Sequence, residues 1–169
     1  FLTGREVSVL SFVDGKVVKT MTSAQDHKRA RDGDQGPNTG GMGCFSPSPF
    51  YTKEVDEYCR KNIYQPTVDA MAAEGREFKG VIFFGLILTG QGPKVLEYNA
   101  RFGDPETQVV LCRMKNDLLD VVDACVDGTL DKIELEFEDN AAVCVVLASD
   151  GYPVSYQKGF EITGLERFT

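Results

Sequence analysis

One run of apolar residues sets the strongest constraint on the fold. Residues 80–88, GVIFFGLIL, are continuously apolar over the length of a strand. Such a run is typical of a strand that other elements cover on both faces. The turn sequence TGQGP follows and leads into KVLEYNA at 94–100, so the sequence predicts a β-hairpin here.

Further strands are expected near the two ends of the chain. Residues 5–13 are β-branched and aromatic, Asp14-Gly15 is a tight-turn dipeptide, and KVVKTM resumes the apolar pattern, which predicts a second hairpin. ELEFED at 134–139 alternates, and AAVCVVLAS at 141–149 is continuously apolar. Both segments predict strands, and the composition shift around them places a domain boundary between residues 135 and 136.

The middle of the chain combines a long irregular segment with a helix. Residues 22–49 show almost no periodicity, so we expect a long ordered loop, of the kind that carries function. Apolar residues at helical spacing then predict a helix that begins at Thr52 and ends at Gly75. Pro66 should kink this helix or divide it in two.

Two shorter helices are predicted after the central hairpin. Asp104-Pro105 is a suitable N-cap and first residue for a helix through TQVVLCRMK. The other helix, LLDVVDACV, is capped by Asn116 or Asp117 and ended by Gly128.

Composition excludes several classes of function. The 18 Lys and Arg residues stand against 26 Asp and Glu, a formal net charge of −8 that argues against a nucleic-acid partner. The apolar runs are too short to span a bilayer and no signal peptide opens the chain, so we expect no membrane partner and a cytoplasmic location. His27 is the only histidine, which excludes a His-rich metal site, and five widely spaced cysteines disfavour a disulfide framework.

A Glu-x-Asn pair near the end of the second hairpin is a candidate metal site. Side chains alternate along a strand, so Glu97 and Asn99 should point to one side, with Leu96 and Tyr98 on the other. Hard oxygen ligands that leave positions open are those that Mg²⁺ takes when it arrives on a nucleotide. The alternative is a strand end at which Asn99 supports a turn and Glu97 faces solvent.

Anion-binding features follow this pair directly. Arg101 has a fork of donors suited to phosphate or carboxylate, Gly103 permits close backbone approach, and Asp104 precedes a helix N-terminus that attracts anions. A salt bridge from Arg101 to Asp104 or Glu106 is the structural alternative, and Asp104 is expected to serve as an N-cap in either case.

A second candidate site is the loop QDHKRARDGDQGPNTGGMG at residues 25–43. His27, Lys28 and Arg29 form a basic cluster that could focus an anionic ligand. Glycines here could form backbone nests around phosphate, together with Asn38 and Thr39; they include Gly36, Gly40, Gly41 and Gly43. The alternatives are a solvated charge run and a mobile lid. Glu6, within the first strand, either holds this basic loop, approaches a nucleotide or simply faces solvent.

Three stretches together, LTGREVSVLSFVDGK, AQDHKRARDGDQGPNTGGMG and LEYNARFGDPETQ, resemble the phosphoribosylamine–glycine ligase (glycinamide ribonucleotide synthetase) family of ATP-grasp enzymes. The resemblance covers the whole chain in order. It implies an α+β fold: residues 1–135 form the C-terminal lobe of an ATP-grasp domain, a largely antiparallel sheet with packed helices. Residues 136–169 begin a small β-rich domain.

The resemblance also implies an activity. In this family Mg-ATP phosphorylates the carboxylate of glycine, and the amine of 5-phosphoribosylamine attacks the glycyl phosphate, giving glycinamide ribonucleotide, ADP and phosphate in purine biosynthesis. Glu97 and Asn99 would hold Mg²⁺, with Mn²⁺ as an alternative, and Arg101 would steady the transferred phosphate. Glu6 would contact the nucleotide. The remaining candidates would contact substrate or phosphate. They are His27, Lys28, Arg29, Asn38, Thr39, Gly40, Gly41 and Asp104.

Two departures from the family pattern matter. GVIFFGLIL lacks the carboxylate that many ATP-grasp enzymes place on this strand, so Glu97 and Asn99 carry the metal assignment alone. The chain begins at Phe1 and stops within GFEITGLERFT, so we interpret it as a fragment, inactive by itself, of a polypeptide with or without further purine-pathway domains. The competing hypotheses are another ATP-grasp carboxylate–amine ligase and a non-catalytic nucleotide- or phosphate-binding module.

Overall fold

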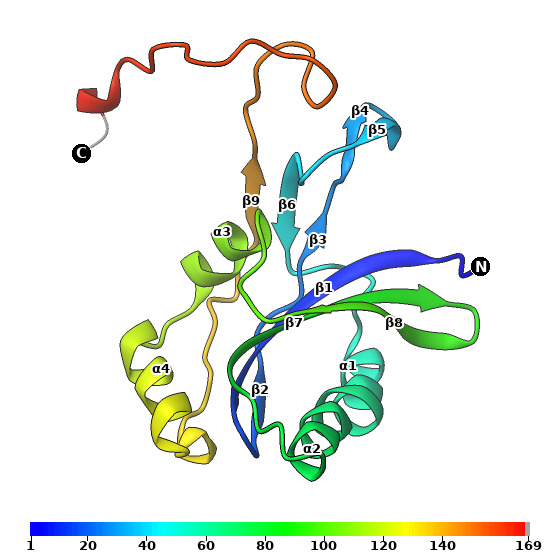
Figure 1. Cartoon of the computed structure of the whole chain (residues 1–169), viewed down its shortest axis with the longest axis vertical. Coiled ribbons are helices and arrows are strands. Elements are labelled where there is room, and N and C mark those ends of the chain that lie inside the picture. Colours follow the sequence, from blue (N-terminus) through cyan, green and yellow to red (C-terminus); the bar gives the residue numbers. More distant parts are fainter. Residues whose placement is uncertain (168–169) are drawn as a thin grey trace.

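The computed structural model describes residues 1–167 and is built around a four-stranded antiparallel sheet. Its strand order is β2-β1-β7-β8 (Figure 1), with β1 at Arg5–Asp14, β2 at Val18–Thr20, β7 at Lys79–Thr89 and β8 at Gly92–Asn99. Both predicted hairpins are present. The Asp14 carboxylate accepts hydrogen bonds from the backbone N–H groups of Lys16 and Val17, and Gly15 has a φ of 98°, which explains the first turn.

Helices cover both faces of this sheet, as the apolar run at 80–88 predicted. On one face, side chains such as Val9 and Phe84 pack against α1 (Lys53–Cys59) and α2 (Gln65–Ala73). On the other, Leu10, Phe12 and Phe83 pack against α4 (Leu118–Asp127), and the two sets of helices lie on opposite sides in Figure 1. The fold is therefore the α+β arrangement with a largely antiparallel sheet that the sequence predicted.

Local signals placed the helix ends correctly in two cases. Thr52 caps α1, its hydroxyl accepting from the Val55 N–H, and a π-helical segment at Arg60–Tyr64 separates α1 from α2 just before Pro66. Helix α4 begins after Asp117, whose carboxylate accepts from the Leu119 N–H, and ends at Gly128 in the left-handed conformation.

The predicted loop at 22–49 is wrong, because the segment contains four short strands. These are β3 (Gln25–Asp26), β4 (Arg29–Arg31), β5 (Gln35–Asn38) and β6 (Gly43–Ser46). β4 pairs with β5, while β3, β6 and β9 (Ala142–Val145) form a three-stranded sheet. A bridge between Ser8 and Ala24 connects this part to the edge of β1, which positions β3 beside the central sheet.

The helix predicted to open at Asp104-Pro105 is shorter and differently capped. α3 spans Glu106–Val110 and continues as a 3-10 turn to Arg113, and its N-cap is Pro105, which makes no side-chain cap hydrogen bond. The Asp104 carboxylate instead accepts from the Gln108 side-chain amide at 2.6 Å. The N-cap prediction for Asp104 is therefore wrong, since this carboxylate bonds a side chain one turn along.

The strand predicted at 134–139 does not form either. Apart from one bridge between Met114 and Phe137, this segment is irregular, and it is held by the buried side chain of Arg113. The guanidinium donates to the Thr22 and Ser46 hydroxyls, each at 2.9 Å, and to acceptors at residues 138 and 140. Fixed in this way, the chain continues into β9.

The segment after β9 extends away from the sheets (Figure 1). A 3-10 turn at Leu165–Arg167 ends the described part, and residues 168–169 of the predicted second domain lie outside it. The boundary between residues 135 and 136 stays a prediction. Within residues 1–167, no helix combines the length and the apolar character needed to cross a membrane.

Arg113→Met should destabilise the protein by about 3 kcal/mol, because hydrogen bonds to a charged group are lost and buried acceptors are left unpaired. Urea unfolding measures the change. Arg76→Met is the matched control, since this exposed side chain makes one 3.9 Å ion pair, and its effect should stay within about 0.5 kcal/mol. Equal losses in the two variants would contradict the proposed role of Arg113.

Candidate functional site

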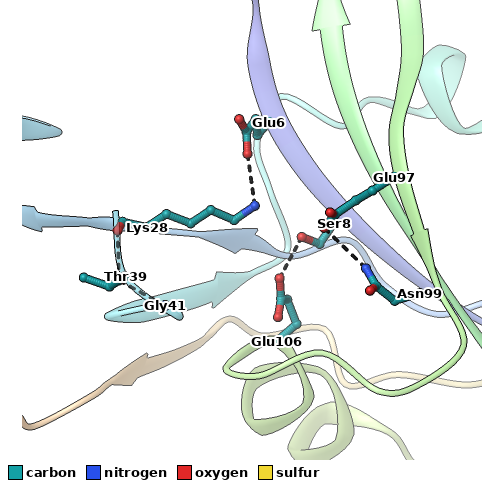
Figure 2. A network of polar contacts seen from close by, with 8 residues as sticks. All are labelled: Glu6, Ser8, Lys28, Thr39, Gly41, Glu97, Asn99 and Glu106. Carbon is teal, nitrogen blue, oxygen red and sulfur yellow. Dashed lines mark hydrogen bonds and ion pairs between the residues drawn. The ribbon is translucent and has the colours of Figure 1, made fainter. Parts of the chain in front are cut away.

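One row of residues crosses three strands of the central sheet. Ser8 on β1 pairs with Gly85 on β7, which in turn pairs with Glu97 on β8. Paired residues point to the same face of a sheet, so Ser8, Gly85 and Glu97 share one face. Figure 2 shows Ser8 and Glu97 on this face. A Cβ on Gly85 would lie 2.8 Å from Cγ of Glu97, so only glycine leaves this middle position open.

A β-bulge aims Glu97 at this face. The register shifts on β8, where Glu97 pairs with Gly85 but Val95 pairs with Leu86, which leaves Leu96 as the extra residue. Because of this shift Val95 packs into the core beneath α1 and α2, whereas Glu97 faces the other side. Leu96 departs from the predicted alternation, since it lines a cavity of about 210 Å³ together with Glu97, Ser8 and Lys28.

Glu97 and Asn99 lie together as the sequence predicted. The Asn99 side-chain amide donates to Oε1 of Glu97 at 3.3 Å (Figure 2), while Tyr98 packs on Phe84 on the opposite face. Among residues 1–167, Oε2 of Glu97 and Oδ1 of Asn99 form no further hydrogen bond, and both are hard oxygen donors suited to Mg²⁺. Within residues 1–167, no group of three or more His, Cys, Asp or Glu residues could hold a metal ion. The donor chemistry therefore fits a metal that takes its remaining ligands from elsewhere.

Lys28 is the cation beside this row. Its ammonium lies 3.3 Å from Oε2 of Glu6, in an ion pair whose two side chains are about half exposed, at 43% and 55%. Burial alone would lower the pKa of Lys28, but neighbouring carboxylates, Glu6 first among them, raise it above its ordinary value. Glu6 thus pairs with the basic segment, one of the three roles expected of it, while its contact with a nucleotide stays a prediction.

The other residues of the basic and glycine-rich segment either line a second cavity or support the backbone beside it. His27, Arg29 and Asn38 line a cavity of about 430 Å³, which shares Glu6 and Lys28 with the first. Thr39 donates through its N–H and its hydroxyl to the Lys28 carbonyl, at 2.7 and 2.8 Å. The Gly41 N–H donates to the Thr39 hydroxyl, and the Gly40 N–H donates to the hydroxyl of Tyr152.

Arg101 and Asp104 remain at the margin of the site. Arg101 is exposed, and its guanidinium donates to the adjacent Phe102 carbonyl at 2.8 Å. Within residues 1–167 it forms no ion pair, so the alternative salt bridge to Asp104 or Glu106 is absent. Asp104 is exposed and bonds Gln108.

Three polar residues that the sequence analysis did not assign to the site lie at its floor. The Ser8 hydroxyl donates to Oε1 of Glu106 at 2.9 Å (Figure 2), and Glu106 is only 3% exposed. Asp26 lies next to them, with its Oδ1 atom buried and without a hydrogen-bond partner. Burial first, and then the charge of Glu106, raise the pKa of Asp26 to about 6. The sequence offered one hint of these residues, a serine within an apolar strand. Serines are common in strands, however, and do not mark a site by themselves.

A cavity of about 690 Å³ lies on the opposite face, between α2 and β8. Its lining is mostly apolar and includes Pro66, Met71, Phe78 and Tyr98. Polar residues, among them Asn62, Thr67 and Glu74, also contribute to this lining. The Glu97 and Lys28 side chains belong to the cavity on the Ser8–Glu97 face instead.

Comparison with known proteins matches residues 1–107 to the family "Phosphoribosylglycinamide synthetase, ATP-grasp (A) domain". Over 166 residues the chain is 54% identical to phosphoribosylamine–glycine ligase from Rhodopirellula baltica, covering 98% of this chain and 38% of that relative. It is 52% identical to the trifunctional purine biosynthetic protein adenosine-3 of Gallus gallus, covering 98% of this chain and 17% of the relative. The chain thus spans about two fifths of the single-function relative.

The fold is also found in a solved relative. The crystal structure of phosphoribosylamine–glycine ligase from Thermotoga maritima superposes with a TM-score of 0.81 at 34% identity, covering 94% of this chain and 40% of that one. The α+β ATP-grasp lobe expected from the sequence is thereby confirmed.

Gly41→Ala should destabilise the protein more than Gly33→Ala. Both glycines have positive φ, at 121° and 69°, which costs an alanine about 1–2 kcal/mol. A Cβ on Gly41 would also lie 2.4 Å from Pro105 and 3.0 Å from Oδ1 of Asp26, whereas Gly33 has open space. Overpacking adds about 1–3 kcal/mol for Gly41→Ala alone. Equal unfolding free energies in urea would show that the Gly41 contact is unimportant.

Asp26→Asn should change the pH dependence of stability. The folded-state pKa of Asp26 is about 6, above its ordinary value of 3.8, so its contribution to stability is complete below pH 4 and is lost as the pH rises through 6. The variant should therefore unfold at a higher temperature than the parent above pH 6, with a difference that vanishes by pH 4. Asp32→Asn, in the exposed β4–β5 turn, should follow the parent throughout. A pH-independent difference for Asp26→Asn would contradict the shift.

Proposed function

Because the chain belongs to the phosphoribosylglycinamide synthetase ATP-grasp (A) domain family, we propose that it supplies the metal- and phosphate-binding lobe of a phosphoribosylamine–glycine ligase. The reaction would consume ATP, glycine and 5-phosphoribosylamine, and yield glycinamide ribonucleotide, ADP and phosphate. The observation that carries the proposal is the face on which Glu97 and Asn99 lie beside Lys28. Fusion to further purine-pathway domains, as in the trifunctional chicken relative, is compatible with it.

The metal assignment rests on oxygen donors. Glu97 and Asn99 would hold Mg²⁺, or Mn²⁺ in its place, and the metal would neutralise charge on the phosphates of ATP during phosphoryl transfer. The bulge at Leu96 supports this role, because it directs the Glu97 carboxylate to the open face rather than into the core. The sheet fixes the direction of both donors before any ligand arrives, and such preorganisation favours binding.

Cationic groups would receive the anionic parts of the substrates. Lys28, positioned by Glu6, would meet a phosphoryl oxygen, and its raised pKa keeps it charged at neutral pH. His27 and Arg29, with Asn38, would contact the phosphate of 5-phosphoribosylamine in the second cavity. Arg101 is exposed at the end of β8 and would have to leave the Phe102 carbonyl to steady the transferred phosphate.

The glycine-rich segment and Asp104 have supporting roles in the proposal. Thr39 fixes the Lys28 backbone, and Gly41 lets the segment pass close to Pro105. Gly40 donates its N–H to the Tyr152 hydroxyl. Asp104 would contact substrate only at the rim, since it is exposed. Glu6 would contact the nucleotide from the wall that the two cavities share.

Glu97→Gln should reduce ligation by about 100-fold or more, because one charged ligand to the metal is lost where charge develops in the transition state. The measurement is glycine- and phosphoribosylamine-dependent ADP release by a polypeptide of the relatives' full length that carries this sequence, titrated with Mg²⁺. Glu57→Gln, an exposed change on α1, should match the parent. The 169-residue chain alone should show no turnover, because it spans two fifths of the relatives.

Three results would contradict these proposals. Near-parental turnover of Glu97→Gln at every Mg²⁺ concentration would remove Glu97 from the metal site. A parent without ligation would overturn the proposed activity. Robust glycine-dependent ADP release by the 169-residue chain would overturn its expected inactivity.

A further inference from the structure

The carboxylates of the site differ in their hydrogen-bond partners, and one of them has a buried oxygen atom without any. Glu6 pairs with Lys28, Glu97 bonds Asn99, and Glu106 accepts from Ser8. Asp26 instead leaves its buried Oδ1 unpaired, a situation that native structures rarely tolerate without a reason. The residue is nevertheless part of the lining of the 430 Å³ cavity, the space where the acceptor substrate is expected.

The surroundings of Asp26 keep it close to this space. Asp26 lies on β3 and pairs with Cys44 on β6, so the sheet fixes its backbone. Gly41 lies against Oδ1 on one side, and a larger residue does not fit there, because its Cβ would lie 2.4 Å from Cδ of Pro105 as well as 3.0 Å from that oxygen. The basic residues His27 and Arg29 line the same cavity, so an amine that carries a phosphate would meet Asp26 at one end and this basic lining at the other.

We propose that Asp26 is the proton acceptor for the attacking amine of the acceptor substrate. This inference rests on the proposed ligase function. The amine nitrogen attacks the carbonyl carbon of glycyl phosphate and forms the C–N bond, and the C–O bond to phosphate breaks as phosphate leaves with the electron pair. The proton released from nitrogen passes to the Asp26 carboxylate and from there to solvent.

The groups facing Asp26 favour this role. Glu106 from α3 and Glu6 from β1 raise its proton affinity, whereas the Lys28 ammonium and the His27 backbone N–H lower it. Burial has the largest effect and gives a pKa of about 6. The Cys44 thiol on β6 has its pKa raised to about 12 by burial and by the same two acids, so it stays neutral. A base whose pKa lies near neutrality both exists as carboxylate at pH 7 and binds a proton readily.

The neighbouring acids serve other purposes. Glu106 is almost fully buried and its Oε1 is occupied by the Ser8 hydroxyl. The Glu6 carboxylate is neutralised by Lys28. Asp34 also lines the cavity but lies in the exposed β4–β5 turn. Asp26 is therefore the acid that combines a place in the cavity lining with a buried oxygen that no hydrogen bond fills.

The test uses a full-length polypeptide that carries this sequence, with the variant Asp26→Asn. Ligation with phosphoribosylamine, formed in situ from ribose 5-phosphate and ammonia, should fall by at least about 100-fold, the usual contribution of a positioned base. The acidic limb of the pH–rate profile, with an apparent pKa near 6 in the parent, should disappear. Glycyl phosphate formation, trapped by hydroxylamine as glycine hydroxamate, should stay within threefold of the parent, as should the KM for ATP.

Controls separate proton transfer from folding and from the ligase assignment. Asp32→Asn removes the same charge in the adjacent exposed turn and should match the parent in every assay. Asp26→Asn should unfold at the parental temperature or above it at pH 7, which shows that the variant is folded.

Each remaining outcome would overturn the inference. Unchanged ligation and an unchanged pH profile in Asp26→Asn would remove the residue from the reaction. Equal losses of ligation and hydroxamate formation would give Asp26 a positioning role instead. A parent that forms hydroxamate but does not ligate, or that does neither, would overturn the proposed function itself, and this inference with it.

Discussion

The pairing of β1 with β7 is the constraint on which the rest of the structure depends. The two strands stay in register from Arg5 opposite Leu88 to Asp14 opposite Lys79, without a bulge. Alternate side chains from these strands build two cores, one beneath α1 and α2 and one beneath α4. A slip of one residue would exchange the two faces and move Ser8 into the α1–α2 core. The register that buries the apolar residues therefore also places the polar row.

β1 and β7 pair without a register shift, whereas β8 contains a bulge. The regular pair builds the cores, and the bulge shapes the site. Regular alternation would direct Val95 and Glu97 to the same face, so either an apolar side chain would be exposed or a carboxylate would be buried. The bulge at Leu96 resolves this conflict and satisfies both requirements. Gly85 completes the arrangement from the neighbouring strand, because any side chain there would meet Glu97. Two local irregularities thus produce the open site on an otherwise regular sheet.

Sequence reasoning succeeded where the determinants are local. The cap at Thr52, the cap at Asp117 and the left-handed end at Gly128 each depend on a few neighbouring residues. It failed where partners lie far apart: β6 acquires its strand character from β3 and from β9, which lies about a hundred residues later. Periodicity over 22–49 carries no information about those pairings.

The site residues also divide into those that local sequence predicts and those that depend on distant partners. Glu97 and Asn99 share a strand, so their common direction follows from alternation, although the bulge that sets it could not be foreseen. The contact between Ser8 and Glu106 joins residues 98 positions apart, and neither residue is unusual by itself. Asp26 lies within the QDHK stretch at residues 25–28. Its significance depends on burial beside Glu106, which only the packing of α3 against β6 reveals.

The charge of the site has a consequence for its ligands. In the part of the chain that the structure describes, four acids, Glu6, Asp26, Glu97 and Glu106, surround the single ammonium of Lys28. The site therefore carries a negative field although its proposed substrates are phosphates. Free polyanions would be repelled, whereas a nucleotide that brings its own divalent cation delivers positive charge to Glu97. The other basic residues, Arg5, His27 and Arg29, line only the second cavity. For the proposed function, this arrangement would favour metal-bound over free nucleotide on the open face and a smaller anion in the neighbouring cavity.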